Sequence, residues 1–306
     1  MTVSSDKKLT LVFVAGNNSI AIVDNAAEAA SGSIALPNVT ESIAILPDGS
    51  TAFAAIRNTG QVAVLDLTNK IIASNIAIPT ARRLVLSHNG AKMLAFSDDS
   101  DALNVIDTAA KTATSIAGFD RPVWGVFTRD DSKAFILNCG PECGGRTASV
   151  TVLDMTSNTL GANVLVSAAT IGLLDGSNLY VAGTTAGGGR LDLVDSAALQ
   201  VTKSGIAISD GFHHTMALAS NGKVFIGART CTGITTGCLS IFNAAAGTAV
   251  VDAQKGEVTG IQPISNRNVV YVIEGGELRI YDTATSAEQA KQIDIVGKAF
   301  DVKSID

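Results

Sequence analysis

Two closely spaced pairs of cysteines carry the most definite chemistry in this 306-residue chain. Three residues separate Cys139 from Cys143, and six separate Cys231 from Cys238. An even number of cysteines in local pairs is typical of disulfides formed in an oxidising compartment, and a disulfide would brace each short loop. A zinc site, which would need both pairs to converge on one ion, and free thiols are the alternatives. We expect the disulfides Cys139–Cys143 and Cys231–Cys238, and no metal site.

A second group of residues combines cations, imidazoles and the single tryptophan. Its members are Arg82, Arg83, Arg121, Trp124, His213, His214 and Lys298, with Glu41 as an acid in the equivalent position. This mixture could bind an anionic or sugar-like molecule. In a catalytic version, His214 is the base, Arg82 polarises a carbonyl group and Glu41 assists. The alternative is a set of solvated residues whose histidines bond to the neighbouring backbone.

Motifs of known catalytic chemistry are absent from the sequence. It contains no G-x-S-x-G, H-E-x-x-H or C-x-x-C-H. An enzyme of this sequence would therefore need a site assembled from scattered residues. We predict that the protein has no catalytic residues and no cofactor.

The elements that must position these side chains come from a repeat. Seven apolar segments each end in an acidic or amide marker residue followed by small polar residues. The markers are Asp24, Asp66, Asp107, Asp154, Asp195, Asn243 and Asp282, spaced by 42, 41, 47, 41, 48 and 39 residues. A strand-built period near forty is typical of a β-propeller, in which each repeat forms one blade. We expect each marker to accept backbone N–H groups in an Asx turn.

The strand pattern predicts an all-β, seven-bladed β-propeller with four-stranded blades, in a single domain over residues 1–306. In the second repeat the four strands are expected at 41–46, 51–57, 62–66 and 71–78. The first blade, 8–37, has no evident first strand, whereas 298–306 has the pattern of one. We therefore expect the C-terminal strand to pair with the N-terminal blade and close the ring. The other predicted blades are 38–79, 80–118, 119–166, 167–208, 209–256 and 257–297.

Segments 36–79 and 78–118 resemble the YVTN-type, surface-layer-like repeats of bacterial and archaeal seven-bladed propellers. The shared pattern is a proline, a turn such as Pro47-Asp48-Gly49, an apolar strand and then V-x-V-[IL]-D. The YVTN tetrapeptide is replaced by FVAG at 13–16, FAAI at 53–56, YVAG at 180–183 and YVIE at 271–274. The resemblance implies a relation to cell-surface and S-layer proteins, to periplasmic proteins and to lactonase-like enzymes.

Strand order then assigns the loops to faces. In a four-stranded meander, the loops between second and third strands share a face with the connections between blades. Both cysteine loops are expected on this loop-rich face, separated by the repeat 167–208, which argues against a shared zinc ion. The cations, histidines and tryptophan begin first strands, and so are expected near the channel mouth on the same face.

The net charge and the short apolar runs limit the classes of partner that the protein can bind. The net charge is −6, and the apolar runs are far shorter than the ~18 residues of a membrane helix. We expect no nucleic-acid partner, no transmembrane segment, a monomer, and an extracytoplasmic location with a leader already removed. The predicted function is a non-enzymatic module that binds a protein, peptide or glycan on its loop-rich face. A lactonase-like hydrolase or lyase is the alternative.

Overall fold

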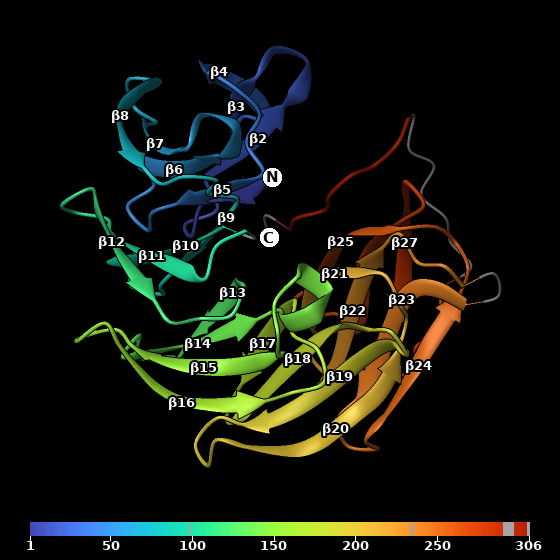
Figure 1. The fold of residues 1–306 in the computed structure, drawn as a ribbon. Coiled ribbons are helices and arrows are strands. Elements are labelled where there is room, and N and C mark those ends of the chain that lie inside the picture. Colours follow the sequence, from blue (N-terminus) through green and yellow to red (C-terminus); the bar gives the residue numbers. More distant parts are fainter. Residues whose placement is uncertain (98, 234–235, 290–296, 305–306) are drawn as a thin grey trace. The chain divides into compact units, whose positions relative to one another are not determined.

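The computed structural model describes residues 1–97, 99–233, 236–289 and 297–304. It is an all-β, seven-bladed propeller of antiparallel blades, as predicted, and within each sheet the strands follow chain order (Figure 1). The first four sheets comprise β1 (Thr2–Val3), β2 (Leu9–Val14), β3 (Ser19–Asp24) and β4 (Ala29–Ala35); β5 (Ser42–Ile45), β6 (Thr51–Ile56), β7 (Gln61–Asp66) and β8 (Ile71–Ala77); β9 (Arg83–Leu86), β10 (Lys92–Phe96), β11 (Ala102–Asp107) and β12 (Thr112–Ala117); and β13 (Pro122–Phe127), β14 (Lys133–Asn138), β15 (Ser149–Asp154) and β16 (Thr159–Leu165).

The other three sheets complete the repeat. They comprise β17 (Ile171–Asp175), β18 (Asn178–Thr185), β19 (Gly188–Asp195) and β20 (Gln200–Ile208); β21 (Phe212–Leu218), β22 (Lys223–Arg229), β23 (Thr236–Asn243) and β24 (Thr248–Ala253); and β25 (Val258–Pro263), β26 (Val269–Glu274) and β27 (Glu277–Asp282). A bridge between Tyr281 and Glu288 continues the last sheet at the edge of the described residues. The helical elements are single 3₁₀ turns, η1 (Ala15–Asn17), η2 (Arg57–Thr59) and η3 (Gly140–Cys143). Among the described residues, no helix is long and apolar enough to cross a membrane.

The chain divides into two compact units. Residues 1–136 and 152–161 belong to the first, and residues 137–151 and 162–304 to the second. In each unit, apolar side chains of consecutive blades pack together. In the first, for example, Leu11 and Ile20 pack with Ile56, and in the second Phe225 packs with Tyr281. Burial of apolar surface between neighbouring blades is therefore the main stabilising contribution within each unit.

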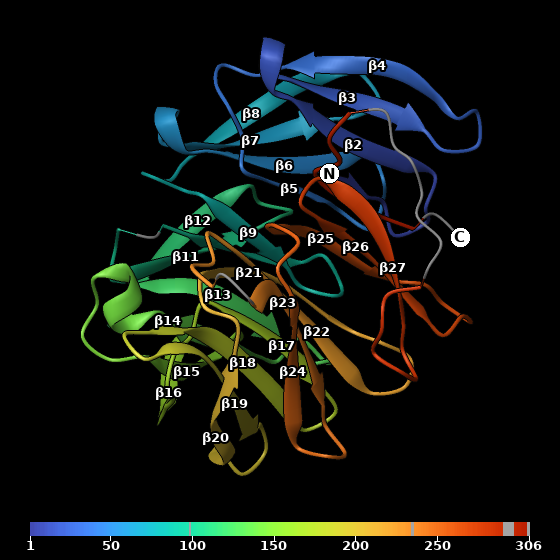
Figure 2. The ribbon, with the colours of Figure 1, turned by 90° about the vertical axis from the view of Figure 1, so that its right-hand side faces the viewer.

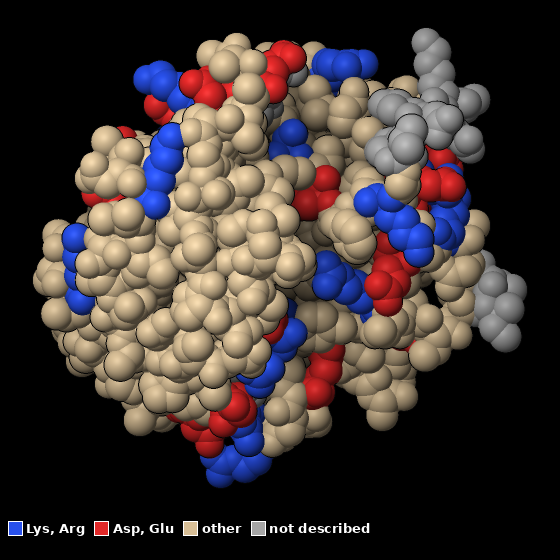
Figure 3. Space-filling view, turned by 90° about the horizontal axis from the view of Figure 1, so that it is seen from above, with Lys and Arg blue, Asp and Glu red and all other residues tan. Residues whose placement is uncertain are grey.

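The outer strands of the first four blades carry no charge. The sequences of β4, β8, β12 and β16 contain no Lys, Arg, Asp or Glu and are built mainly from Ala, Ser, Thr, Asn and Ile. A broad area without charged side chains is visible on one face of the molecule (Figure 3). These strands lack the lysines that often protect an exposed sheet edge.

The marker residues form the predicted Asx turns. In every repeat, the side-chain oxygen accepts at least one backbone N–H two or three residues later. The bonds run to Asp24 from Ala26 and Ala27, to Asp66 from Asn69, to Asp107 from Ala110, to Asp154 from Thr156 and Ser157, to Asp195 from Ala197 and Ala198, to Asn243 from Ala245 and Ala246, and to Asp282 from Ala284 and Thr285. The structural interpretation of these residues is confirmed.

The fourth residue after each marker has a left-handed backbone, which the sequence did not reveal. These residues are Glu28, Lys70, Lys111, Asn158, Leu199, Gly247 and Ser286, with φ between 51° and 70°. Only one of the seven is glycine, so the other six carry the modest cost of a positive φ. The geometry of the turn therefore outweighs the preference of a non-glycine residue for a negative φ.

The first blade corrects a prediction. The strand beside β2 is β1, with Thr2 opposite Leu11 and Val3 opposite Thr10, and β2, β3 and β4 lie side by side (Figure 2). Residues 298–304 form no strand, and 305–306 lie outside the described residues. Instead, Ala299 donates to the Gly276 carbonyl, and the segment packs against Gly260 of β25. A short local hairpin closes at lower entropic cost than a pairing between the chain ends, which explains the error.

Replacing Asp195 tests the marker turns, because its carboxylate accepts two backbone N–H groups at 2.8 Å. Asp195→Ala should lower the free energy of unfolding by about 1 kcal/mol. Asp195→Asn should cost clearly less, since Asn243 performs the same role in the sixth blade. Urea denaturation of the two variants measures the difference, and equal losses would contradict the proposed role.

Candidate functional site

The predicted mouth residues of the first unit are paired with one another. Arg82 Nε donates to Glu41 Oε2 at 2.5 Å. The Arg121 backbone N–H donates to the Asp101 carboxylate, whose oxygen also lies 3.9 Å from the Arg121 guanidinium. Two of the cations expected to attract an anion are therefore already balanced by carboxylates.

Arg83 and Trp124 form a second contact in this unit. Arg83 begins β9, next to Arg82, and consecutive side chains near a strand point to opposite sides. Arg82 thus reaches Glu41 of the preceding blade, while the Arg83 guanidinium lies 5.8 Å from the centre of the Trp124 ring in the following blade. The half-buried indole and the arginine form a cation–π pair. Such a pair offers a flat amphipathic surface to a ligand.

The two histidines lie in the second unit at a β-bulge. His213 opposes Ala228 and Thr215 opposes Gly227, so His214 is the extra residue of β21. His213 has no exposed surface, and its Nδ1 lies 3.4 Å from Thr184 Oγ1. Burial lowers the pKa of His213 to about 4, although the Ser209 backbone and the Asp210 charge oppose this change. His213 is therefore a neutral interior residue at pH 7.

Lys298 is exposed, and neither histidine lines the hollow beside it. It lines a hollow of about 200 Å³ together with Glu257, Thr259 and the Gly275–Gly276 turn between β26 and β27. Of the three residues proposed for catalysis, Glu41 and Arg82 touch in the first unit, and His214 belongs to the second.

Both predicted disulfides are present. The Cα atoms are 5.6 Å apart in Cys139–Cys143 and 5.7 Å apart in Cys231–Cys238. Each disulfide closes the loop between the second and third strands of its blade, as expected. In the part of the chain that the structure describes, no three His, Cys, Asp or Glu side chains are placed to hold a metal ion.

The intervening repeat connects the two disulfide loops rather than separating them. Glu142, inside the first loop, accepts the Thr184 backbone N–H at 2.7 Å. The Thr184 hydroxyl donates to the Gly211 carbonyl at 2.6 Å. A Cβ on Gly211 would lie 3.1 Å from the sulfur of Cys231, so this glycine sits directly against the second disulfide. We call these residues, from Glu142 through Thr184 to Gly211, the brace.

Glycines allow the segments that the brace connects to approach one another closely. A Cβ on Gly183 would lie 2.8 Å from the Ala169 nitrogen and 3.0 Å from Glu142 Oε2, and one on Gly189 would overlap the Ser209 carbonyl. The glycine-rich segment 183–189 is the tip of a long hairpin, because β18 and β19 run through it and leave only Ala186 and Gly187 between them.

Two carboxylates hold the second disulfide loop. Asp210 accepts the backbone N–H and the hydroxyl of Thr232, and Glu257 accepts the Thr230 N–H at 3.0 Å. Glu257 also lines the hollow beside Lys298. Contacts therefore link the brace to the second disulfide loop, and Glu257 links that loop to the Lys298 hollow, all within the second unit.

A polar cluster in the second unit surrounds two fully buried side chains, Tyr281 and Glu274, and sequence reasoning missed it. The Tyr281 hydroxyl lies 2.5 Å from Asp252 Oδ2 and 2.8 Å from Glu274 Oε2, and Lys255 Nζ approaches it to 3.1 Å. Lys255 also pairs with Asp252 at 2.7 Å and with Glu288 at 2.9 Å. Arg279 binds Glu288 at 2.8 Å and lies 3.9 Å from Glu274.

The hydrogen count identifies which carboxyl group is protonated. A tyrosine hydroxyl has one hydrogen to donate, yet Tyr281 meets two carboxyl groups. Asp252 also accepts from Lys255, which favours its ionised form, so Tyr281 donates to Asp252 and the Glu274 carboxyl group donates to Tyr281. Glu274 is fully buried, and burial raises its pKa to about 7, although the charges of Lys255 and Arg279 oppose this change.

One feature of the sequence could have indicated this cluster. The residue before the marker is apolar in six repeats, whereas the seventh has Tyr281. A hydroxyl at a core position requires a buried partner. The partners themselves lie up to 29 residues away and could not be assigned from the sequence.

Comparisons with known proteins support the fold. No family model and no curated protein matches the sequence. Among solved structures, Kuenenia stuttgartiensis hydrazine synthase matches with a TM-score of 0.64 and 18% identity over 80% of this chain and 76% of that one. Dihydro-heme d1 dehydrogenase NirN in complex with DHE matches with a TM-score of 0.70 and 13% identity, over 95% and 74%. The Cps50 (Swd1) β-propeller domain of Myceliophteria thermophila matches with a TM-score of 0.65 and 12% identity, over 89% and 92%. At these identities the likeness concerns the fold alone.

The buried cluster predicts a stability that falls as the pH rises. Glu274 is protonated in the folded state up to about pH 7, whereas in the unfolded chain it ionises near its usual pKa of 4.5. The stabilisation is complete below pH 4.5 and is lost between there and about pH 7, by up to about 3 kcal/mol. In Glu274→Gln, whose amide can donate to Tyr281, this part of the pH dependence should disappear.

Urea denaturation at pH 5 and pH 8 measures the effect. Glu277→Gln is the matched control, because Glu277 lies across the same turn and its side chain is exposed. The control should retain the pH dependence of the unmodified protein. A Glu274→Gln variant with unchanged pH dependence would show that Glu274 is ionised in the folded protein.

Proposed function

We propose that this protein is a non-enzymatic, extracytoplasmic propeller of the YVTN type that binds a protein, peptide or glycan on its loop-rich face. The observation that carries the proposal is the brace. Hydrogen bonds from Glu142 through Thr184 to Gly211 connect two disulfide-closed loops on one surface.

A braced surface suits recognition for an energetic reason. Loops that are already ordered lose little conformational entropy when a partner binds, so more of the contact energy appears as affinity. The disulfides in turn suit an oxidising compartment outside the cytoplasm. Trp124, held beside Arg83, provides an aromatic anchor of the kind that is frequent at interfaces.

The arrangement of the mouth residues favours binding over lactone chemistry. The Arg82 guanidinium, proposed to polarise a carbonyl group, is bound to Glu41 at 2.5 Å. His213, the neighbour of the proposed base His214, is buried and neutral. A catalytic pair of base and electrophile would require Arg82 to leave Glu41 first.

Ligand selection tests the proposal directly. The purified protein is used to screen a random-peptide phage library and a glycan array, and selected ligands are measured by biolayer interferometry. For a ligand selected on the first unit, we expect Trp124→Ala to weaken binding by about tenfold or more, because an indole anchor is removed. For a ligand selected on the second unit, Glu142→Ala should weaken binding and should speed hydrogen exchange at the Thr184 amide. Arg129→Ala should have no effect, because Arg129 lies in the turn between β13 and β14, at the other end of its blade from the loop between second and third strands.

A lactone panel gives the opposing test. No turnover above background is expected from the unmodified protein. Failure to select any ligand, together with a hydrolysis rate that is lost in His214→Ala, would overturn the proposal and support the lactonase-like alternative.

A further inference from the structure

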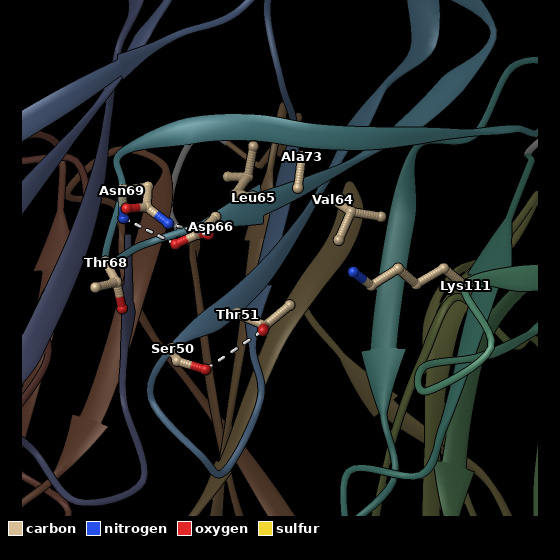
Figure 4. Close-up of a pocket in the computed structure, with 9 residues that line it drawn as sticks. All are labelled: Ser50, Thr51, Val64, Leu65, Asp66, Thr68, Asn69, Ala73 and Lys111. Carbon is tan, nitrogen blue, oxygen red and sulfur yellow. Dashed lines mark hydrogen bonds between the residues drawn. The ribbon is translucent and has the colours of Figure 1, made fainter.

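A polar hollow of about 320 Å³ lies in the first unit, away from the loop-rich face. It is formed by the marker turn of the second blade, with Asp66 and Asn69, by Thr51 of β6 and by Lys111 of the third blade (Figure 4). Ala73 of β8 also lines it, and its volume is near the lower end of the range for small-molecule sites, ~300–1,000 Å³. The mouth residues and the disulfides take no part in it.

The neighbouring repeat shows what normally occupies this position. Lys70 and Lys111 are each the fourth residue after a marker, with φ of 58° in Lys70 and 55° in Lys111. Lys70 Nζ donates to the carbonyl of Ser31, the extra residue of a β-bulge in the preceding blade. Ala73 is the extra residue of the equivalent bulge beside Lys111, since Val64 pairs with Ser74 and Leu65 with Ile72.

One side chain explains why Lys111 does not repeat the contact. A Cβ on Gly32 would lie 2.6 Å from Cδ of Lys70, so this glycine leaves room for the lysine stem. The equivalent residue in the second blade is Ser74, whose Cβ blocks that path. Among the described residues, the Lys111 ammonium makes no hydrogen bond or ion pair, and in Figure 4 it extends toward the hollow.

The lining determines the kind of ligand. Lys111 and Asn69 supply N–H donors, Asp66 supplies carboxylate lone pairs, and Thr51 can both donate and accept. Asp66 uses its oxygens for the Asn69 backbone and side chain at 2.8 Å, yet a carboxylate can accept about four hydrogen bonds. One positive and one negative group leave the hollow close to neutral. A neutral ligand with many hydroxyls matches this balance better than an anion, which Asp66 would repel, or a cation, which Lys111 would repel.

We propose that this hollow binds a neutral polyhydroxylated ligand, a monosaccharide or the end of a glycan chain. Lys111 donates to a ligand oxygen and Asp66 accepts from a ligand hydroxyl. The site is separate from the loop-rich face and does not depend on the function proposed for that face.

Titration with simple sugars tests the assignment. Glucose, galactose, mannose, N-acetylglucosamine and maltose are titrated by isothermal calorimetry and by NMR, with inorganic phosphate as the anionic probe. At least one sugar should bind with a Kd of the order of millimolar. Lys111→Asn, which tolerates the left-handed backbone, should weaken it by about tenfold or more.

Lys7→Asn is the matched control, because it makes the same change at an exposed left-handed residue, with φ of 58°, that does not line the hollow. It should leave sugar binding unchanged, and Trp124→Ala should do so too, which distinguishes this site from the loop-rich face. Circular dichroism and thermal melts confirm that each variant is folded. The proposal is overturned if no sugar binds up to about 100 mM, if Lys7→Asn weakens binding as much as Lys111→Asn, or if phosphate binds more tightly than every sugar.

Discussion

The path of the chain in every blade depends on the backbone hydrogen bonds that one side-chain oxygen accepts at the end of the third strand. These bonds start the turn into the outer strand in all seven repeats, with Asn243 replacing aspartate once. The turn then requires a left-handed residue four positions after the marker, whatever its side chain. That residue can lie next to the preceding blade, as the contact from Lys70 to Ser31 shows. A local turn therefore decides a contact between blades.

Charged groups are handled differently at the surface and in the interior. At the mouth of the first unit, Glu41 and Arg82 neutralise each other where water still screens them, so the pair contributes little to stability. In the second unit, Glu274 is fully buried, and removing a charge from water is costly. Burial raises the pKa of Glu274, so its carboxyl group can keep its proton beside Tyr281, while Lys255 and Arg279 balance the remaining acids. Glu274 is therefore uncharged in the interior when its carboxyl group keeps its proton.

The two candidate binding surfaces differ in how they are built. The loop-rich surface of the second unit combines long loops with disulfides and the brace, which reduces the loss of entropy on binding. The hollow beside Lys111 arises from the repeat itself, where Ser74 replaces the glycine of the preceding blade. The first arrangement provides a broad, rigid area. The second provides a small, nearly neutral hollow.

The sequence by itself determined the seven blades, the order of their strands, the marker turns and the pairing of the cysteines. Each of these depends on residues close together in the chain, whose turn and strand preferences act locally. The tertiary structure decided that Thr2 and Val3, not residues 298–306, pair with β2, that His213 is buried, and that Glu274 meets Tyr281 and Asp252. It also decided where Lys111 points. These outcomes depend on packing between segments distant in sequence, where a single Cβ or one shorter loop changes which partner fits.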